Sequence, residues 1–511
     1  MDNYFVSSCK RVKDWICRQF GQKEKKTVHH KKLADGGEVI VWETGRAGEE
    51  AASYENLFLR KEIAGFRTNI RREQSCSIKS LTRDYLYKQL LSSGEYTFDH
   101  MLVIKDPYGE APLTALALFM LEEPACVRVT TKGNLKVTDF VTELPKKKEH
   151  RVPILGMYAE KANDIVIEIL DDEGNCVKSH TFTIRTKRLP KSLRNVITVK
   201  KWTDKPAYSN IMINGGVKIH TCVFDIEGKI RYYLSRKPRG YGIFPLSDGH
   251  FFYMEKYISV PSYSNPQTVE SYDMDYFGRV FRTYLTEKGV HHTAEEKAGG
   301  NILTGSNSML EHTEDCVIEI DRQTGEIVWQ LNMAELFDET YQNMMDWCHV
   351  NSAAYYEKDR TILISLRNVH AVICVDYDTK KLRWILSDPK FWEGTKMTPY
   401  LLQPEGDVKW CYQQHAAFEI ALPDESNPQK KRIIVYDNHW AKRRKAKSFD
   451  KDPLSYVSFY DIDEEKKTVS LHKRFAGPKT RIRANGIYVP DKKRVYNMAG
   501  SYAEPVDGDG G

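Results

Sequence analysis

Three histidines occupy the same position in three successive copies of one sequence repeat. His292, His349 and His415 each open a strand-like run that is followed by a turn and an apolar strand. Residues at equivalent points of a repeat lie at equivalent points in space, and in a radial architecture that point can be the central axis. We therefore expect the three imidazoles to converge. Imidazole can act as a nucleophile, as a general acid or base, or as a metal ligand.

Two polar residues accompany the second histidine of this set. Asn351 lies two residues beyond His349, so both side chains point to the same side of a strand. Arg367 ends the apolar run Ile362–Leu366. That arginine is either a solvated strand end or ion-pair partner, or a guanidinium fork for a tetrahedral oxyanion. Histidine and arginine together suit an anionic substrate.

The same repeat position can be followed into an earlier copy, where Tyr241 occupies it. The expected ring around the axis therefore holds one tyrosine and three histidines, which is a chemical constellation rather than an apolar core. A second histidine, His291, directly precedes His292, and the sequence does not decide which of the two faces the axis.

Three imidazoles could instead bind zinc and leave one coordination position open, as in a metal-dependent hydrolase. Such sites usually place a carboxylate behind each imidazole, and an arginine beside a dication would be repelled. We expect no acidic partners here, and therefore no metal and no cofactor. The sequence also lacks the HExxH and GxSxG motifs and any glycine-rich phosphate loop.

The repeat itself is a strand that ends in aspartate, a tight turn and a returning strand. Copies recur every ~50 residues, which is the period of four-stranded propeller blades. The five clear hairpins are Thr221–Ile230, Glu270–Val280, Val317–Trp329, Ala371–Trp384 and Val457–Val469. Ile487–Tyr496 resembles part of a sixth blade, and we expect a strand near Arg194–Val199 to complete it. A propeller that only binds partners is the non-catalytic alternative to an enzyme.

The length of 511 residues exceeds the roughly 250–300 residues of a single core, so several domains are expected. We expect residues 1–95 to form a partly helical extension. Met1–Gln22 predicts a basic amphipathic helix, and a second helix is indicated by Ile78, Leu81, Tyr85 and Leu86, which fit one helical face. Residues 96–195 alternate at period two and predict a small β-sandwich. Residues 196–511 predict a six-bladed β-propeller, so the fold class is all-β.

The composition of the chain excludes several classes of partner and location. The 76 basic and 70 acidic residues are nearly balanced, and acidic residues flank the basic run Lys430–Arg432, so we expect no nucleic-acid partner. No stretch is apolar enough to span a bilayer, and basic residues interrupt the N-terminus where a secretory signal would need an apolar core. The ten cysteines show no metal-type spacing and are expected to be reduced thiols of a cytoplasmic protein.

Several motifs together resemble the bacterial arylsulfate sulfotransferases that work without a nucleotide sulfate donor. The resemblance covers about residues 100 to 500, and each motif is weak by itself. The motifs are Asp106–Leu116, His150–Ala159, Met274–Val280 with Gly289–His292, Asp346–Ser352, Ser365–Arg367 and Gln413–Ala416.

The resemblance implies a six-bladed propeller behind a β-sandwich, and a homodimer. It implies transfer of a sulfuryl group from an aryl sulfate donor to a phenolic acceptor by a ping-pong route. His415 matches the nucleophile that becomes transiently sulfated. The residues that match those holding the sulfate and handling protons are His292, His349, Asn351 and Arg367, and Tyr241 matches a tyrosine that lines the channel.

The chain departs from the family pattern in three places. Thr293 follows the histidine pair where the family commonly has aspartate. Only Cys411 lies near His415, whereas secreted members have a disulfide close to the nucleophile. The secretory signal of those members is also missing. These departures together predict a cytoplasmic enzyme that needs no disulfide machinery.

Overall fold

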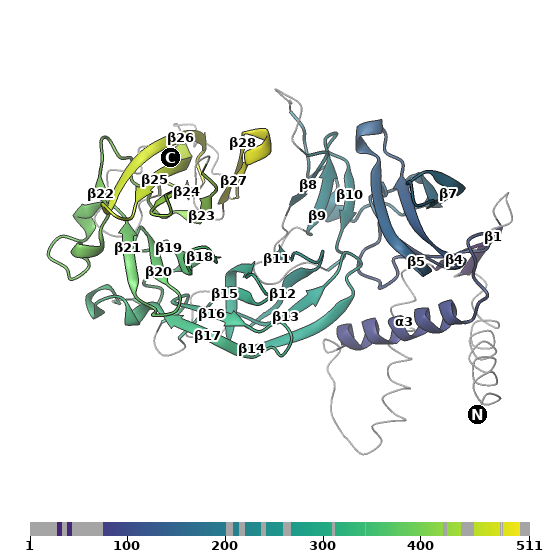
Figure 1. Cartoon of the computed structure of the whole chain (residues 1–511), viewed down its shortest axis with the longest axis horizontal. Coiled ribbons are helices and arrows are strands. Elements are labelled where there is room, and N and C mark those ends of the chain that lie inside the picture. Colours follow the sequence, from purple (N-terminus) through teal and green to yellow (C-terminus); the bar gives the residue numbers. More distant parts are fainter. Residues whose placement is uncertain are drawn as a thin grey trace, which may run out of the picture. The chain divides into compact units, whose positions relative to one another are not determined.

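The computed structural model describes thirteen stretches of the chain, whose fold is almost entirely β (Figure 1). The described residues are 28–32, 38–42, 75–200, 208–213, 220–236, 242–258, 267–308, 312–342, 344–422, 427–440, 454–480, 482 and 484–500. The helix expected over Met1–Gln22 lies outside these stretches. Among the described helices, none has the length and apolar character needed to cross a bilayer.

The chain divides into two compact units. One contains residues 1–237 with 273–283, and the other contains residues 238–272 with 284–511. Every residue of the candidate site discussed below belongs to the second unit.

The first unit contains the predicted sandwich. Its five-stranded antiparallel sheet runs β3-β4-β6-β7, with β5 also paired to β4. Period-two alternation buries one face of this sheet, and the hairpin β9-β10 contributes Cys222, Ile230 and Tyr233 to the same core. The strands are β3 (Leu102–Lys105), β4 (Ala115–Thr131), β5 (Phe140–Ile154), β6 (Ala162–Leu170), β7 (Cys176–Arg185), β8 (Asn210–Ile213), β9 (Cys222–Asp225) and β10 (Ile230–Tyr233).

The same unit holds the helix α3 (Ser75–Ser92) and the short hairpin of β1 (Val28–Lys32) and β2 (Glu38–Trp42). A helix in this region was expected and forms, but its predicted apolar face is only partly right, since Leu86 packs against the cluster below while two other residues of that face do not. Leu81 and Tyr85 are 66% and 65% exposed, whereas Tyr87 and Leu91 are buried. The two buried side chains pack into a cluster with residues of β3 and β4, so tertiary packing selected a face that only partly matches the one that periodicity favoured.

The second unit consists of antiparallel blades, which confirms the predicted all-β fold of sandwich and propeller. Strands β11 to β17 follow one another in a seven-stranded sheet, in which the long β14 serves two successive blades (Figure 1). The strands are β11 (Gly242–Pro245), β12 (Phe251–Ile258), β13 (Gln267–Met274), β14 (Val280–Glu296), β15 (Ile302–Ser306), β16 (Cys316–Ile320) and β17 (Ile327–Asn332).

The next blades are a four-stranded sheet, β18-β19-β20-β21, and the sheet β23-β24-β25-β26, to which β22 adds beside β26. Nearly every residue of β18 to β20 is buried, because neighbouring blades cover both faces of that sheet. The strands are β18 (Val350–Tyr356), β19 (Thr361–Leu366), β20 (Ala371–Asp376), β21 (Leu382–Leu386), β22 (Gln403–Pro404), β23 (His415–Ile420), β24 (Lys430–Asp437), β25 (Leu454–Asp463) and β26 (Thr468–Pro478).

All five predicted hairpins form, and the expected partial blade appears as β27 (Ala484–Val489) paired with β28 (Arg494–Ala499). The strand expected at Arg194–Val199 does not form. Ile197 and Val199 instead approach Gly228 in the β9-β10 turn, at which an added Cβ would lie 3.2 and 3.0 Å from their methyl carbons.

Candidate functional site

The three repeat-equivalent histidines each lie at an irregularity in the first strand of a blade. The register shifts in β14 just after His291, in β18 just after Val350 and in β23 just after His415. A β-bulge bends its strand and redirects side chains, which is why bulges often occur beside functional sites. The structural equivalence inferred from the repeat is therefore present in the fold.

Backbone strain collects at the same places. His292 and His349 have φ angles of +56° and +57°, and Glu314, Gln413 and Ala416 also have positive φ. Left-handed conformations are uncommon for residues other than glycine, although asparagine, aspartate and histidine adopt them more often than the rest. Further positive-φ residues occur elsewhere in the described chain, so these angles accompany the bulges without marking the site by themselves.

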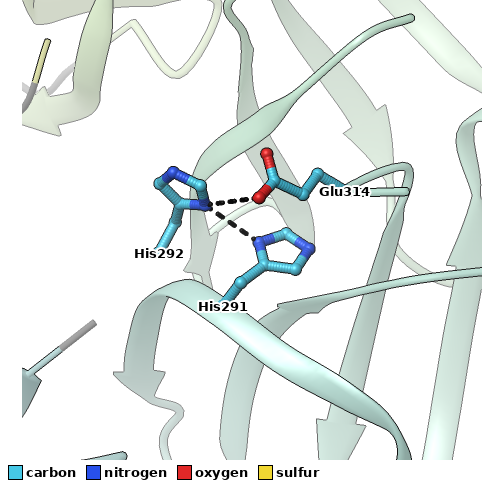
Figure 2. Close-up of side chains that lie close together, drawn as sticks. All are labelled: His291, His292 and Glu314. Carbon is cyan, nitrogen blue, oxygen red and sulfur yellow. Dashed lines mark hydrogen bonds and ion pairs between the residues drawn. The ribbon is translucent and has the colours of Figure 1, made fainter. Parts of the chain in front are cut away.

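Two of the three imidazoles are in direct contact. The rings of His292 and His349 lie 4.7 Å apart in an edge-to-face arrangement. His291 also lies against His292, with 3.2 Å between their Nδ1 atoms (Figure 2). Its own Nε2 donates to the carbonyl of Ser306 at 2.8 Å. His292 is thus the member of the pair that meets His349, and His291 supports it.

The site contains two carboxylates that the sequence analysis did not assign. Glu314 lies 2.6 Å from Nδ1 of His349 and 3.8 Å from Nδ1 of His292. Asp346 is hydrogen-bonded to the same Nδ1 of His349 at 2.9 Å. The expectation of a site without acidic partners was wrong. The spacing of Asp346 three residues before His349 could have suggested that pair, but Glu314 comes from a separate loop and carries no motif.

These partners give the histidines different charges. Burial alone would lower the pKa of His349, but Glu314 and Asp346 outweigh it and raise that pKa to about 9. Burial holds the pKa of His292 well below its ordinary value against the opposing effect of Glu314, and neighbouring His349 and His291 add to the lowering. At neutral pH the site therefore contains one imidazolium, at His349, beside a neutral imidazole.

His415 is also neutral, for a different reason. Burial, together with the positive charges of Arg367 and His349, lowers its pKa to about 3. Its Nδ1 lies 2.7 Å from Oδ1 of Asn438. A neutral buried imidazole near two cationic groups keeps the lone pair that a nucleophile requires.

Arg367 follows the end of β19, as predicted. Its guanidinium donates to Oε1 of Gln413 at 3.3 Å, and its backbone N–H donates to the carbonyl of His349 at 3.1 Å. The arginine is thereby tied to the segments that carry both His349 and His415, which does not fit a freely solvated strand end.

Asn351 joins the same two segments. Its Nδ2 donates to the backbone carbonyl of Gln414 at 2.8 Å, directly before His415. Its Oδ1 is buried and has no hydrogen-bond partner among the described residues. Tyr241, the remaining predicted site residue, lies outside the described residues.

Some of these side chains could also hold a cation. Two overlapping groups, His291 with His292 and Glu314, and Glu314 with Asp346 and His349, each place their ligand atoms within 4.8 Å of one another. The metal-dependent alternative therefore has a structural basis that the sequence did not show, and it has to be tested directly.

Comparison with known proteins decides the family. Residues 195–504 match the arylsulfotransferase (ASST) family, and residues 102–187 match the arylsulfotransferase Ig-like domain. The chain belongs to the arylsulfotransferase family. It is 22% identical to the arylsulfate sulfotransferase AssT of Escherichia coli O6:H1 and 21% identical to that of Lelliottia amnigena, each over 72% of this chain and 78% of the relative.

Two of the solved structures that match this arylsulfotransferase resemble it distantly. An auxiliary nutrient binding protein from Bacteroides thetaiotaomicron matches with a TM-score of 0.34 and 12% identity, over 76% of this chain and 91% of that one. Sqt1 from Chaetomium thermophilum matches with a TM-score of 0.33 and 8% identity, also over 76% and 91%. Neither likeness bears on function.

The bridge from Asn351 to Gln414 predicts a stability effect. We expect Asn351→Leu to lower the free energy of unfolding by about 1–3 kcal/mol, because the buried carbonyl of Gln414 loses its amide donor. Urea denaturation followed by tryptophan fluorescence measures this change. Asn351→Asp has almost the same shape but sets an oxygen against that carbonyl, so it should destabilise at least as much. Equal stability of both variants and the parent would contradict the bridging role.

Proposed function

We propose that this arylsulfotransferase moves a sulfuryl group from a phenolic sulfate ester to a phenolic acceptor by a ping-pong route through a sulfated His415. The observation that carries the proposal is the division of charge among its histidines. A neutral, buried His415 has a lone pair for attack, while His349 holds a proton at neutral pH. Family membership supports the substrate class.

In the first half-reaction His415 attacks sulfur, and the bond from sulfur to the phenolic oxygen breaks. That oxygen leaves with the electron pair and takes a proton from His349. Arg367 faces the negative charge on the sulfuryl oxygens, and removing one such donor commonly costs about 10²–10³ in rate. A positioned acid contributes roughly 10²–10⁴ when the leaving group is a basic phenolate.

In the second half-reaction the acceptor phenol returns a proton to His349, and its oxygen attacks the sulfur. The nitrogen–sulfur bond breaks, and its electron pair goes back to His415. Neutral His292, in ring contact with His349, acts as a hydrogen-bond acceptor that orients the phenol. Splitting one transfer into two covalent steps in this way permits ping-pong kinetics.

The charges around the site support a sulfate ester over a phosphate ester. Glu314 and Asp346 are two carboxylates against one imidazolium, so among the site residues that the structure describes little positive charge remains beyond that of Arg367. A sulfate monoester carries a single negative charge, whereas a phosphate monoester approaches two at neutral pH. The second negative charge of a phosphate ester would be repelled by the two carboxylates, with no further positive charge to offset the repulsion.

The test is mass spectrometry of the protein mixed with an aryl sulfate in the absence of acceptor. We expect an adduct with the mass of a sulfuryl group on the peptide that contains His415, and its loss when a phenol is added. Turnover of the donor with no covalent adduct at any time point would contradict the ping-pong route.

The metal-dependent hydrolase is the second candidate, because of the carboxylate–histidine groups around Glu314. We expect prolonged dialysis against EDTA to leave the transfer rate unchanged, and elemental analysis to find less than stoichiometric metal. Loss of activity that added Zn²⁺ restores would instead favour the hydrolase. A protein that only binds partners would turn over no donor in either preparation.

A further inference from the structure

We propose that Asn438 is a positioning residue for His415, and that its neutral amide, where many nucleophile–histidine pairs have a carboxylate, keeps the sulfated imidazole reactive. This inference rests on the proposed function. Asn438 lies directly after β24, in no motif that the sequence analysis singled out, and is completely buried.

The orientation of the Asn438 amide follows from its partners. Nδ2 donates to Oγ1 of Thr480 at 2.9 Å and approaches the carbonyl of Thr480 at 3.4 Å. A carbonyl oxygen only accepts, so the NH₂ group faces Thr480 and the amide oxygen faces His415. Ser455 secures both neighbours, since its hydroxyl donates to the carbonyl of Asn438 at 3.0 Å and accepts from the N–H of Thr480 at 2.8 Å.

This orientation assigns the tautomer of His415. The amide oxygen 2.7 Å from Nδ1 accepts a hydrogen bond, so Nδ1 carries the hydrogen. A neutral imidazole has only one N–H, and the lone pair is therefore on Nε2. Nε2 is the atom that attacks sulfur. Asn438, Thr480 and Ser455 are each less than 1% exposed, so water does not compete for these hydrogen bonds.

The choice of an amide matters for the second half-reaction. When the lone pair of Nε2 forms the bond to sulfur, Nδ1 keeps its hydrogen and the ring becomes positively charged. A carboxylate partner would stabilise that charge and make the ring a poorer leaving group. An amide fixes the tautomer without supplying a negative charge, so the bond to sulfur breaks more readily when the acceptor attacks.

The site itself offers the contrast. Glu314 and Asp346 raise the pKa of His349 against its burial, whereas His415 faces only an amide there, and burial with the charges of Arg367 and His349 lowers its pKa. Among the described residues, the charged or titratable groups that act on His415 include Arg367, His349 and His292. The one carboxylate adjacent to Asn438 in sequence, Asp437, is instead engaged with His439 and Arg474.

The decisive experiment is Asn438→Asp in the full-length protein, with the pH dependence of adduct formation and the adduct's lifetime as readouts. An added negative charge this close shifts a pKa by about 1–3 units. We expect the acidic limb of adduct formation to move up by about that amount. We also expect transfer from the sulfated enzyme to a phenol to slow by about tenfold, because a more basic nitrogen leaves less readily.

Two further variants separate positioning from folding. Asn427→Asp makes the same change at an exposed residue of the same blade, where the side-chain oxygen likewise accepts a hydrogen bond, and should alter neither readout. Thr480→Val removes the hydroxyl partner of the amide and should slow adduct formation without moving the acidic limb. It also provides the test if the aspartate variant does not fold.

An unchanged acidic limb and an unchanged adduct lifetime in folded Asn438→Asp would overturn the inference. Absence of any adduct in the parent protein has a different meaning, because it would reject the proposed function itself. The two failures are therefore distinguishable in one set of measurements.

Discussion

His415→Ala is expected to abolish sulfuryl transfer and to leave no adduct on the protein. Removal of the nucleophile from covalent enzymes reduces turnover by factors on the order of 10⁶. The loss comes from the missing imidazole itself. Arg367 and His349 stay in place in this variant, but no group remains to accept the sulfuryl group from the donor. Initial rates with an aryl sulfate and a phenol, together with intact-protein mass spectrometry, measure both consequences.

A matched control is available on the same blade. His472 in β26 has a 41% exposed side chain, and His472→Ala should retain parental activity. Added imidazole should partly restore transfer in His415→Ala, since a free imidazole can enter the space left by the ring. A fully active His415→Ala variant would remove this residue from the nucleophile role, and with it the ping-pong route.

The positions of the three histidines were predictable because equivalent residues of a sequence repeat occupy equivalent places in successive blades. His292, His349 and His415 were inferred from their place in successive blades, and each one lies at a register shift of its strand. The hairpins were predictable for a related reason. A tight turn is determined by the types of a few consecutive residues, which can be read directly from the sequence.

The partners of those histidines were not predictable in the same way. Glu314 and Asn438 lie between strands and contact residues 35 and 23 positions away. Their contribution is electrostatic and arises only once blades bring separate loops together. A sequence pattern thus identified which side chains meet, but not which of them carries a proton.

The division of charge follows from simple differences in partners. All three imidazoles are buried, and burial disfavours the charged form of each. His349 is exceptional because two carboxylates compensate for the lost hydration. His292 shares Glu314 only at 3.8 Å, and His415 has an amide in place of a carboxylate. Three chemically identical side chains thereby acquire separate tasks.

His349→Gln is expected to reduce transfer by roughly 10²–10⁴ when the donor has a basic leaving group, because the proton for the departing phenolate is lost. Donors that release an acidic phenol, such as 4-nitrophenyl sulfate, should be affected far less. Rates for a series of substituted phenyl sulfates measure the difference as a steeper dependence on the acidity of the released phenol. A merely structural role would lower all of these rates by the same factor.

The pH dependence of the transfer rate should also report the protonation of His349. The fold raises the pKa of His349 from 6.5 to about 9, so the cation and its ion pair are fully present below about 6.5 and are lost as the pH rises through about 9. Transfer from basic-leaving-group donors should therefore decline with a midpoint near 9. Glu314→Gln removes one of the two carboxylates that oppose burial, so this midpoint should move to lower pH. Asp346→Asn should shift it in the same direction, whereas His472→Gln should leave the profile unchanged. A parental profile that stays flat through pH 9 would mean that another group supplies the proton.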